Sequence, residues 1–317
     1  MNVQYLKIKE IREDFFFCFT TLNHPHHMEN SIRLSGIQTP LRVISGDSGF
    51  QLLSGFKRFV AAKKIGLKQI PVSIVPDSAV IDAFHQTVAE QLTTVRAFTL
   101  IEKSRILNIL EKLGVKQGRV KSDFLPLLEL SPKNEILNAV TDLLTLDPKV
   151  QTYIEMYDLS EKQCRIFKKL TSDEQAVFAE LGFQLQIRAV ELLEIITIIM
   201  DISGRDSHGP LGVYKELGIE SILKDTDMTR NDKITAVKTA LRAARFPRIQ
   251  TWNRQLDMLN KKLNLPAGMI LKWDPVLEKS GLICRMQIDS VEVLRNATTV
   301  FSDERNMETI QKMLDIV

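Results

Sequence analysis

The chain has 317 residues, 44% of them hydrophobic and 26% charged, a composition typical of an ordinary soluble globular protein with about two or three domains. Its formal net charge is +3, from 42 Lys and Arg against 39 Asp and Glu, so overall charge alone does not indicate a nucleic-acid partner. The most apolar run, residues 195–200, is far shorter than the ~20 residues that span a bilayer, which excludes a transmembrane helix there and favours a buried helix end.

The cysteines and the first residues indicate a cytoplasmic protein. Cys18, Cys164 and Cys284 are scattered and form neither a disulfide framework nor a CxxC metal pair, so a reducing compartment is the default. The first ten residues carry charges and lack the apolar core of a secretory signal. We therefore expect a cytoplasmic protein without a membrane partner.

The N-terminal segment predicts an edge strand and an aromatic loop. Apolar residues nearly alternate over 3–11, and residues 15–19 are dense in aromatic side chains that should pack on the core. A cluster of imidazoles follows, with Cys18 nearby, which leaves a metal site open: His24, His26 and His27. We favour a polar loop before a helix over 29–34, because no second ligand pair follows at zinc-site spacing.

Residues 36–75 carry the clearest alternation of strand and helix patterns. Apolar residues alternate over 40–44 and 50–53 with a glycine-containing turn between them, which predicts a β-hairpin. Helical spacing follows over 59–65, and Gly66 is expected to end this helix as its C′ residue. Residues 70–75 predict a third strand.

The turn between the second strand and this helix has the composition of an anion site. Gly55 lets backbone N–H groups approach an anion, and the helix dipole favours negative charge there. Lys57 and Arg58 add mobile and forked donors, so a nucleoside triphosphate would suit the turn. Because a GxKR turn is short, an ordinary strand-to-helix connection remains the alternative.

Two helices are predicted after the third strand. Asp77 is expected to cap a helix that begins near residue 79. Strong helical periodicity then runs over 100–113 and stops at Gly114.

The following segment predicts a helix-turn-helix. A basic connector over 116–121 leads to a short helix over 124–130, and Ser131 followed by Pro132 signals the start of a helix over 133–144. The candidate DNA contacts here are Arg119, Lys121, Lys133 and Asn134. A purely structural three-helix unit is the alternative, because the polar set is modest.

Further helices are predicted before a linker. Apolar residues recur at helical spacing over 150–156, 161–170, 172–181 and 185–200. Residues 201–210 are rich in Gly, Ser and charge, and this composition predicts a linker between domains.

Residues 229–262 form the most basic segment. They contain nine Lys or Arg and two Asp, a net charge of +7 that exceeds the charge of the whole chain. Pro247 is expected to break or restart the helix there. The candidate DNA contacts are Arg242, Arg245, Arg248 and Arg254, and a solvated helix face is the alternative.

The C-terminal residues predict a small α/β domain. Two strands are expected over 269–273 and 282–288, followed by helices over 290–297 and 307–317. Pairing of such strands or helices between copies would give a homodimer.

Two motifs resemble a known family. Ser31, Ile32, Gly36, Pro40 and Val43 follow the order SI…G…P…V, and residues 55–58 read GFKR. In the ParB partition-protein family, whose N-terminal fold is shared with sulfiredoxin, such a segment precedes a glycine-arginine phosphate motif that reads GERR in the chromosomal proteins. The chain resembles that family, although Phe56 and Lys57 depart from its motif.

The resemblance implies a nucleotide site that holds CTP with Mg²⁺. The family's second phosphate motif, ENxxR, has its counterpart at Glu90, Gln91 and Arg96, with Glu90 as the metal ligand. The implied nucleotide-binding residues are Gly36, Thr39, Pro40, Gly55, Lys57, Arg58, Glu90, Gln91 and Arg96. No catalytic residue is assigned, since the glutamate of GERR is absent, and no cysteine stands in the turn as sulfiredoxin activity requires.

The resemblance also implies the domain order and the partners. The expected fold is α+β, with a small mixed-sheet ParB/sulfiredoxin-like N-terminal domain over 1–80, an all-α helix-turn-helix domain over 81–202 and a small α/β domain with a basic helix over 211–317. The implied partners are DNA, a second copy in a homodimer and a partition ATPase, which would make the protein nucleoid-associated.

Two other functions stay open. A CTPase or phosphotransferase on the same fold would need a carboxylate near Arg58 to hold magnesium, and Glu90 is the candidate. A transcriptional or plasmid-maintenance regulator that has lost nucleotide binding would explain the departures from both motifs.

Overall fold

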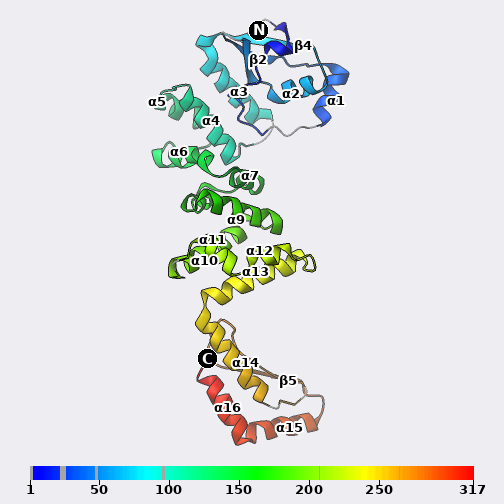
Figure 1. Cartoon of the computed structure of the whole chain (residues 1–317), viewed down its shortest axis with the longest axis vertical. Helices are drawn as coiled ribbons and strands as arrows, with labels where there is room; N and C mark the ends of the chain where they lie inside the picture. The colour runs from blue at the N-terminus through cyan, green and yellow to red at the C-terminus, as the bar shows by residue number, and fades with distance from the viewer. Residues whose placement is uncertain are drawn as a thin grey trace. The chain divides into compact units, whose positions relative to one another are not determined.

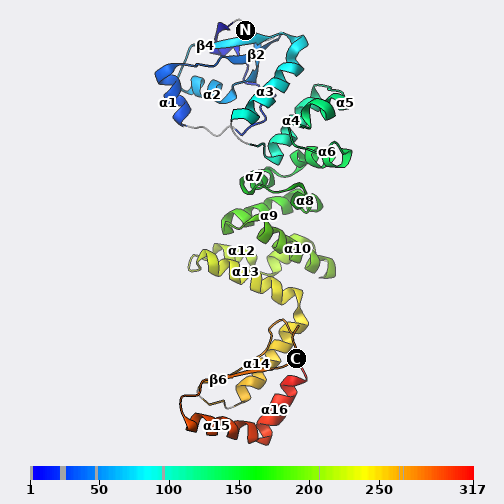
Figure 2. The ribbon, with the colours of Figure 1, turned by 180° about the vertical axis from the view of Figure 1, so that it is seen from behind.

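The chain forms two compact units, Met1–Leu193 and Glu194–Val317, which are described separately. The computed structural model (Figures 1 and 2) describes residues 3–21, 26–46, 49–94, 97–206, 208–263, 265–266 and 268–317. The fold is α+β, as the sequence predicts: a four-stranded sheet near the N-terminus, a two-stranded sheet near the C-terminus and helices elsewhere.

The first unit begins with a mixed sheet. Its strands are β1 (Val3–Lys7), β2 (Leu41–Gly46), β3 (Gly49–Ser54) and β4 (Gln69–Val75). The order is β1-β4-β2-β3, with β2 and β4 parallel and the two other pairs antiparallel. The predicted edge strand, hairpin and third strand are all confirmed.

Three helices accompany the sheet, and they lie beneath it in both views (Figures 1 and 2): α1 (His26–Ser35), α2 (Phe56–Lys64) and α3 (Val80–Thr94). The buried faces of β2 and β4 meet them around Leu41, Val43 and Val72, each fully buried. The burial of each such side chain contributes about 1.5–3 kcal/mol to the stability of the fold. Leu53 and Phe59, on either side of the turn from β3 to α2, are buried in the same core, which holds this turn in place.

The ends of α2 follow from two glycines. Gly55 precedes the helix in a left-handed conformation (φ 95°), and Gly66 follows it with φ 79°, as predicted for a C′ residue. The predicted start of α3 near residue 79 is confirmed, but the predicted cap is wrong. Asp77 lies inside a short 3₁₀ turn, Asp77–Ala79, and therefore does not cap α3.

The helical part of the first unit starts with α4 (Leu100–Lys112), as predicted. Thr99 and Glu102 form a capping box there, and Gly114 follows in a left-handed conformation. Thus both ends of α4 have the residues that helix ends require.

The prediction of a connector over 116–121 is wrong, because most of this segment is helical. It forms α5 (Gln117–Arg119) and the π-helical segment η3 (Val120–Phe124). Val120, Phe124, Leu125 and Leu128 are buried in the core of this unit, and that burial outweighs the weak helix propensity of the segment. Turn hydrogen bonds continue over the predicted short helix, up to Leu130 N–H.

The second helix of the predicted pair is α6 (Asn134–Thr141), followed by a 3₁₀ turn, η4 (Asp142–Thr145). Its N-cap is Lys133 in an extended conformation, so Ser131 is not the cap and the predicted start signal was wrong. The helix begins at Asn134, so Ser131 and Pro132 both lie before it.

The remaining helices of this unit are α7 (Pro148–Tyr157), α8 (Glu161–Cys164), η5 (Phe167–Lys169), α9 (Ser172–Leu185) and the first residues of α10 (Ala189–Asp206). The helix predicted over 161–170 is thus two short pieces. The predicted linker over 201–210 is also wrong, because α10 runs to Asp206 and α11 (Pro210–Glu216) begins at Pro210. The three-part division of the chain stays a prediction.

The second unit continues with α12 (Ile219–Lys224), α13 (Arg230–Arg245) and α14 (Pro247–Lys262). Pro247 is the first residue of α14, so the predicted helix restart is confirmed. The strands β5 (Met269–Lys272) and β6 (Ile283–Met286) pair antiparallel, and α15 (Val291–Ser302) and α16 (Glu304–Leu314) follow. Among the described helices of the chain, none has both the length and the apolarity needed to cross a membrane.

Candidate functional site

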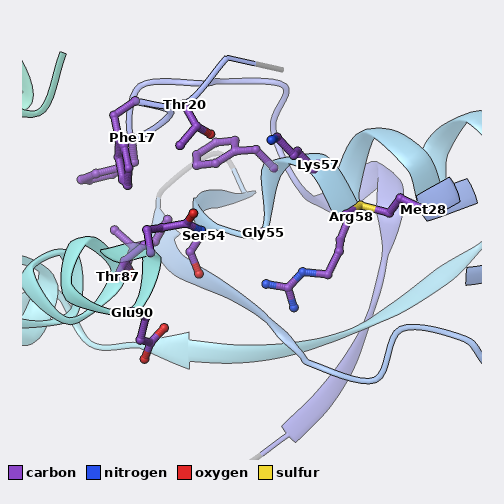
Figure 3. Close-up of a pocket in the computed structure, with 13 residues that line it drawn as sticks. Phe17, Thr20, Met28, Ser54, Gly55, Lys57, Arg58, Thr87 and Glu90 are labelled. Atoms are coloured by element: carbon purple, nitrogen blue, oxygen red, sulfur yellow. The ribbon is translucent and has the colours of Figure 1, made fainter. Parts of the chain in front are cut away.

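A cavity of about 330 Å³ opens where β3 turns into α2 (Figure 3). Its walls come from that turn, from the aromatic segment before α1, from α1 and from α3. The lining residues are Phe17, Phe19, Thr20, Met28, Leu53, Ser54, Gly55, Phe56, Lys57, Arg58, Thr87, Glu90 and Gln91.

Gly55 is required by its conformation and by its neighbours. Its φ of 95° strains any residue with a side chain, and an added Cβ would lie 2.9 Å from Leu41 Cγ and 3.3 Å from Arg58 Nη2. The helix that follows begins with N–H groups that have no partner within the helix. The turn therefore brings backbone donors to the cavity wall at a place where no side chain fits.

Arg58 is held in place by the segment before β2. Its Nη1 donates to the carbonyl oxygens of Thr39 and Pro40, the latter at 3.3 Å. Burial lowers the pKa of the Arg58 guanidinium, the nearby charge of Arg42 lowers it further, and Glu90 acts in the opposite direction. Since burial and a like charge both disfavour the cation, an anion in the cavity would stabilise it.

Arg42 and Glu90 form an ion pair at the edge of the cavity. Arg42 Nη2 lies 2.6 Å from Glu90 Oε1, and Arg42 Nη1 donates to Thr87 Oγ1 at 3.4 Å. The Arg42 side chain is 12% exposed and that of Glu90 59%. In Figure 3 the Arg58 side chain points to the side of the cavity where Glu90 lies, and Lys57 points toward Thr20. The cavity therefore combines two cations, Lys57 and Arg58, with one acid among its described lining residues.

The aromatic wall was not predicted as part of the site. Phe17 and Phe19 are buried, and each packs against Phe84 of α3, with ring centroids 5.8 and 5.9 Å apart. Phe56 is buried and packs against Phe15 with centroids 5.8 Å apart. The dense aromatic run over 15–19 predicted core packing, and the same run also supplies an apolar wall for a ligand.

The structure brings most of the predicted nucleotide residues together. Gly55, Lys57, Arg58, Glu90 and Gln91 all line the cavity. Thr39 and Pro40 are not lining residues, but their carbonyl oxygens accept hydrogen bonds from Arg58, which lines the cavity. Gly36 does not line it: its N–H donates to Ile32 O at 2.9 Å at the end of α1. Arg96 and His24 lie outside the described residues, as do the side chains of His26 and His27.

Comparison with known proteins supports the predicted family. Residues 1–86 match the sequence model of the ParB N-terminal domain. The chain carries a ParB-like N-terminal domain. The cavity is built mainly from residues inside this match, and Glu90 and Gln91 follow it directly on α3.

Three solved structures are similar to the chain. The C-terminally truncated ParB of Caulobacter crescentus complexed with CTP-γ-S is 21% identical, over 57% of this chain and 98% of that one (TM-score 0.27). The truncated Caulobacter ParB complexed to the centromeric parS site is 17% identical, over 60% and 97% (TM-score 0.31). A Pnob8-like ParB-N domain is 14% identical, over 56% and 88% (TM-score 0.36). No curated protein matches the chain.

Glu90 is the carboxylate of the ParB-like domain's cavity that could hold a metal. Mg²⁺ is usually held by one or two carboxylates together with substrate phosphates, so one exposed carboxylate beside a phosphate site fits that chemistry. Gln91 beside it offers an amide oxygen. Among the described residues, no group of three or more His, Cys, Asp and Glu could hold a metal without a ligand.

The predicted DNA contacts near the ParB-like domain differ in their surroundings. Arg119 donates through Nε to Asp123 Oδ2 at 3.2 Å and through Nη2 to Asp82 of α3, and these hydrogen bonds raise the pKa of its guanidinium. Lys133 and Asn134 are exposed at the start of α6. The charge of Arg119 is therefore compensated locally, whereas Lys133 stands on the open surface.

The basic helices of the second unit also differ residue by residue. Arg245 Nη2 lies 2.7 Å from Asp201 Oδ2, and its guanidinium stands 5.4 Å from the centre of the Phe246 ring. Arg242, Arg248 and Arg254 are exposed along α13 and α14. These three arginines are thus placed to reach phosphates, while Arg245 is engaged within the unit.

Proposed function

We propose that the cavity at the start of α2 binds a nucleoside triphosphate, and that the protein is a ParB-like DNA-binding protein switched by that nucleotide. The observation that carries the proposal is the convergence of Gly55, Lys57, Arg58 and Glu90 on one cavity, most of which lies in a ParB-like N-terminal domain. Cytosine is the base that the family resemblance favours.

The phosphates would lie against the first turn of α2. Free backbone N–H groups, the positive end of the helix dipole and two cationic side chains all favour an anion there. Arg58 is already oriented by the carbonyls of Thr39 and Pro40, so little side-chain entropy is lost when it binds. The apolar wall around Phe17 and Phe19 would shield the rest of the ligand from water.

Magnesium would join the site through Glu90. The ion would neutralise phosphate charge, and Glu90 would then exchange its ion pair with Arg42 for the metal. That exchange would leave Arg42 available to the phosphates.

The nucleotide proposal is tested by titration calorimetry of the full chain with CTP, ATP and GTP in the presence of Mg²⁺. We expect CTP to bind, and Arg58→Ala to weaken the binding by about tenfold or more, since a charge-assisted donor to phosphate is lost. Arg33→Ala is the matched control, because Arg33 is exposed on α1 and does not line the cavity. The absence of binding heat with all three nucleotides would contradict the nucleotide switch. It would instead support the alternative function, a regulator that has lost nucleotide binding.

The DNA part of the proposal rests on the surface around α6 and on α13 and α14. Lys121, Lys133 and Asn134 would contact DNA around α6, and Arg242, Arg248 and Arg254 would contact phosphates from the second unit. Capture and sequencing of bound genomic fragments, with and without CTP, tests both contact and switching. The same fragments captured in both conditions would contradict the switch, and random fragments would contradict sequence-specific binding.

A further inference from the structure

The strand β1 is an exposed edge of the N-terminal sheet. It stands at one end of the strand order, next to β4. Val3 is 50% exposed and Tyr5 69% exposed, so both side chains are accessible to a partner. An edge strand carries outward N–H and C=O groups that can pair with another extended chain.

The hydrogen-bond pattern shows which residues of β1 face outward. Ile8 N–H donates to Lys68 O at 3.0 Å, which continues the register of β1 with β4. Since N–H and C=O groups alternate in direction along an antiparallel strand, the even-numbered residues face β4. Val3, Tyr5 and Lys7 therefore direct their backbone groups away from the sheet.

One outward group already has a carboxylate partner. Lys7 N–H donates to Oε2 of the exposed Glu10 side chain at 3.1 Å. This bond belongs to the capping box of the 3₁₀ turn Ile8–Glu10, which follows β1. The Lys7 N–H is therefore already bonded within the chain, and the outward edge that an added strand would use runs over Val3 and Tyr5.

The lysines beside this edge favour an added strand that carries negative charge. A groove of about 690 Å³ runs next to the end of β1, with an apolar floor and a rim of lysines. The lining residues are Lys7, Ile8, Lys9, Leu67, Lys68 and Gln69. A second copy of β1 would bring its own lysines to this rim, and like charges placed opposite each other on paired strands are destabilising.

We propose that β1 binds an extended acidic segment of a partner protein by strand addition. The backbone of the segment pairs with the outward groups of Val3 and Tyr5, and its apolar side chains pack on the side chains of the same two residues. Its Asp or Glu side chains meet Lys7, Lys9 and Lys68. This surface is separate from the cavity at α2 and does not depend on nucleotide.

The test uses the full chain and a fluorescent peptide of about ten residues with valines in one half and glutamates in the other, so that one face of the added strand can meet Val3 and Tyr5 with valine and Lys7 with glutamate. A second peptide carries lysine in place of glutamate, and a third carries proline in place of alternate valines. We expect only the first to bind, with amide NMR shifts in β1 and an affinity that falls with salt. Equal binding of the lysine peptide, or of the proline peptide, would overturn the proposal.

Two protein variants separate charge from backbone pairing. The double variant Lys7→Glu/Lys9→Glu should lose about tenfold in affinity, because rim charges that attract would now repel. Tyr5→Pro removes an outward N–H and leaves the bonds to β4 in place, so it should abolish binding while the protein stays folded. Lys112→Glu, a reversal at an exposed residue of α4, is the control that should bind normally. A short DNA duplex that perturbs the same β1 amides more strongly than the peptide would contradict an acidic protein partner.

Discussion

Arg105 on α4 and Glu155 on α7 form a half-buried ion pair, with Nη1 3.0 Å from Oε1. Both side chains also contact Thr21, whose Oγ1 lies 3.1 Å from Glu155 Oε1 and accepts from Arg105 Nη1 at 3.3 Å. Thr21 directly follows the segment that forms the aromatic wall of the cavity. The pair thus connects that wall to the helices of the first unit.

The first prediction concerns this ion pair. Arg105→Ala should lower the free energy of unfolding by about 1–3 kcal/mol, because it leaves a carboxylate that is only 18% exposed without its charged partner. Lys149→Ala is the matched control: it breaks an exposed pair with Glu180 and should cost less than about 1 kcal/mol. Urea denaturation of both variants measures the difference. Equal losses would show that the Arg105 pair has no structural role beyond an ordinary surface contact.

The second prediction concerns the turn at Gly55. Gly55→Ala should destabilise the protein and remove nucleotide binding, because the left-handed conformation is strained and the new Cβ would displace Leu41. Gly118→Ala is the control. Gly118 lies in α5 with open space around it, so alanine there should be neutral or stabilise by about 0.5–1 kcal/mol. Melting temperature and nucleotide titration together check both variants, and a Gly55→Ala protein that binds normally would contradict the close approach at this turn.

The sequence predicted the core of the candidate site because its signal is local. A strand, a glycine, two cations and a helix start within four residues, and local backbone chemistry is enough to recognise them. The Arg42–Glu90 pair could not be predicted in this way, since 48 positions separate the two residues and only the fold brings them together.

The errors in the helical part have a different cause. Gly118 and the charges around it indicated a connector, whereas burial of Val120 and Phe124 makes the segment helical. Tertiary packing decides such a segment, because its intrinsic propensity is weak. The linker prediction failed similarly, because Ile202 is buried and α10 continues through Gly204 to Asp206.

The third prediction concerns the cysteines. Burial raises the pKa of the Cys164 thiol to about 12, so this thiol stays protonated at pH 8 and should not react with iodoacetamide in the folded protein. Cys284 is exposed on β6 and should react first. Mass spectrometry of the labelled peptides at several urea concentrations checks the order. Labelling of Cys164 before global unfolding would contradict its burial at the end of α8.

The fourth prediction concerns how two cations of the helix-turn-helix region contribute to DNA binding. Lys133→Ala should weaken binding about equally for specific and random duplexes and should lower the salt slope by about one, because an exposed phosphate contact is lost. Arg119→Ala should change the salt slope little, since Asp82 and Asp123 already compensate its charge. It should instead lower stability, because the hydrogen bonds from Arg119 of α5 to Asp82 of α3 and to Asp123 are lost.

Fluorescence anisotropy with a labelled duplex between about 50 and 200 mM salt, combined with thermal melts, separates the two effects. The control is Lys169→Ala, which removes an exposed lysine from η5 and should alter neither quantity. A large drop in salt slope for Arg119→Ala with unchanged stability would mean that Arg119 leaves its two carboxylates on the DNA. The Arg119–Asp82 contact between α5 and α3 would then break when DNA binds. Because α3 also carries Glu90 of the cavity, such a change would couple DNA binding to the nucleotide site.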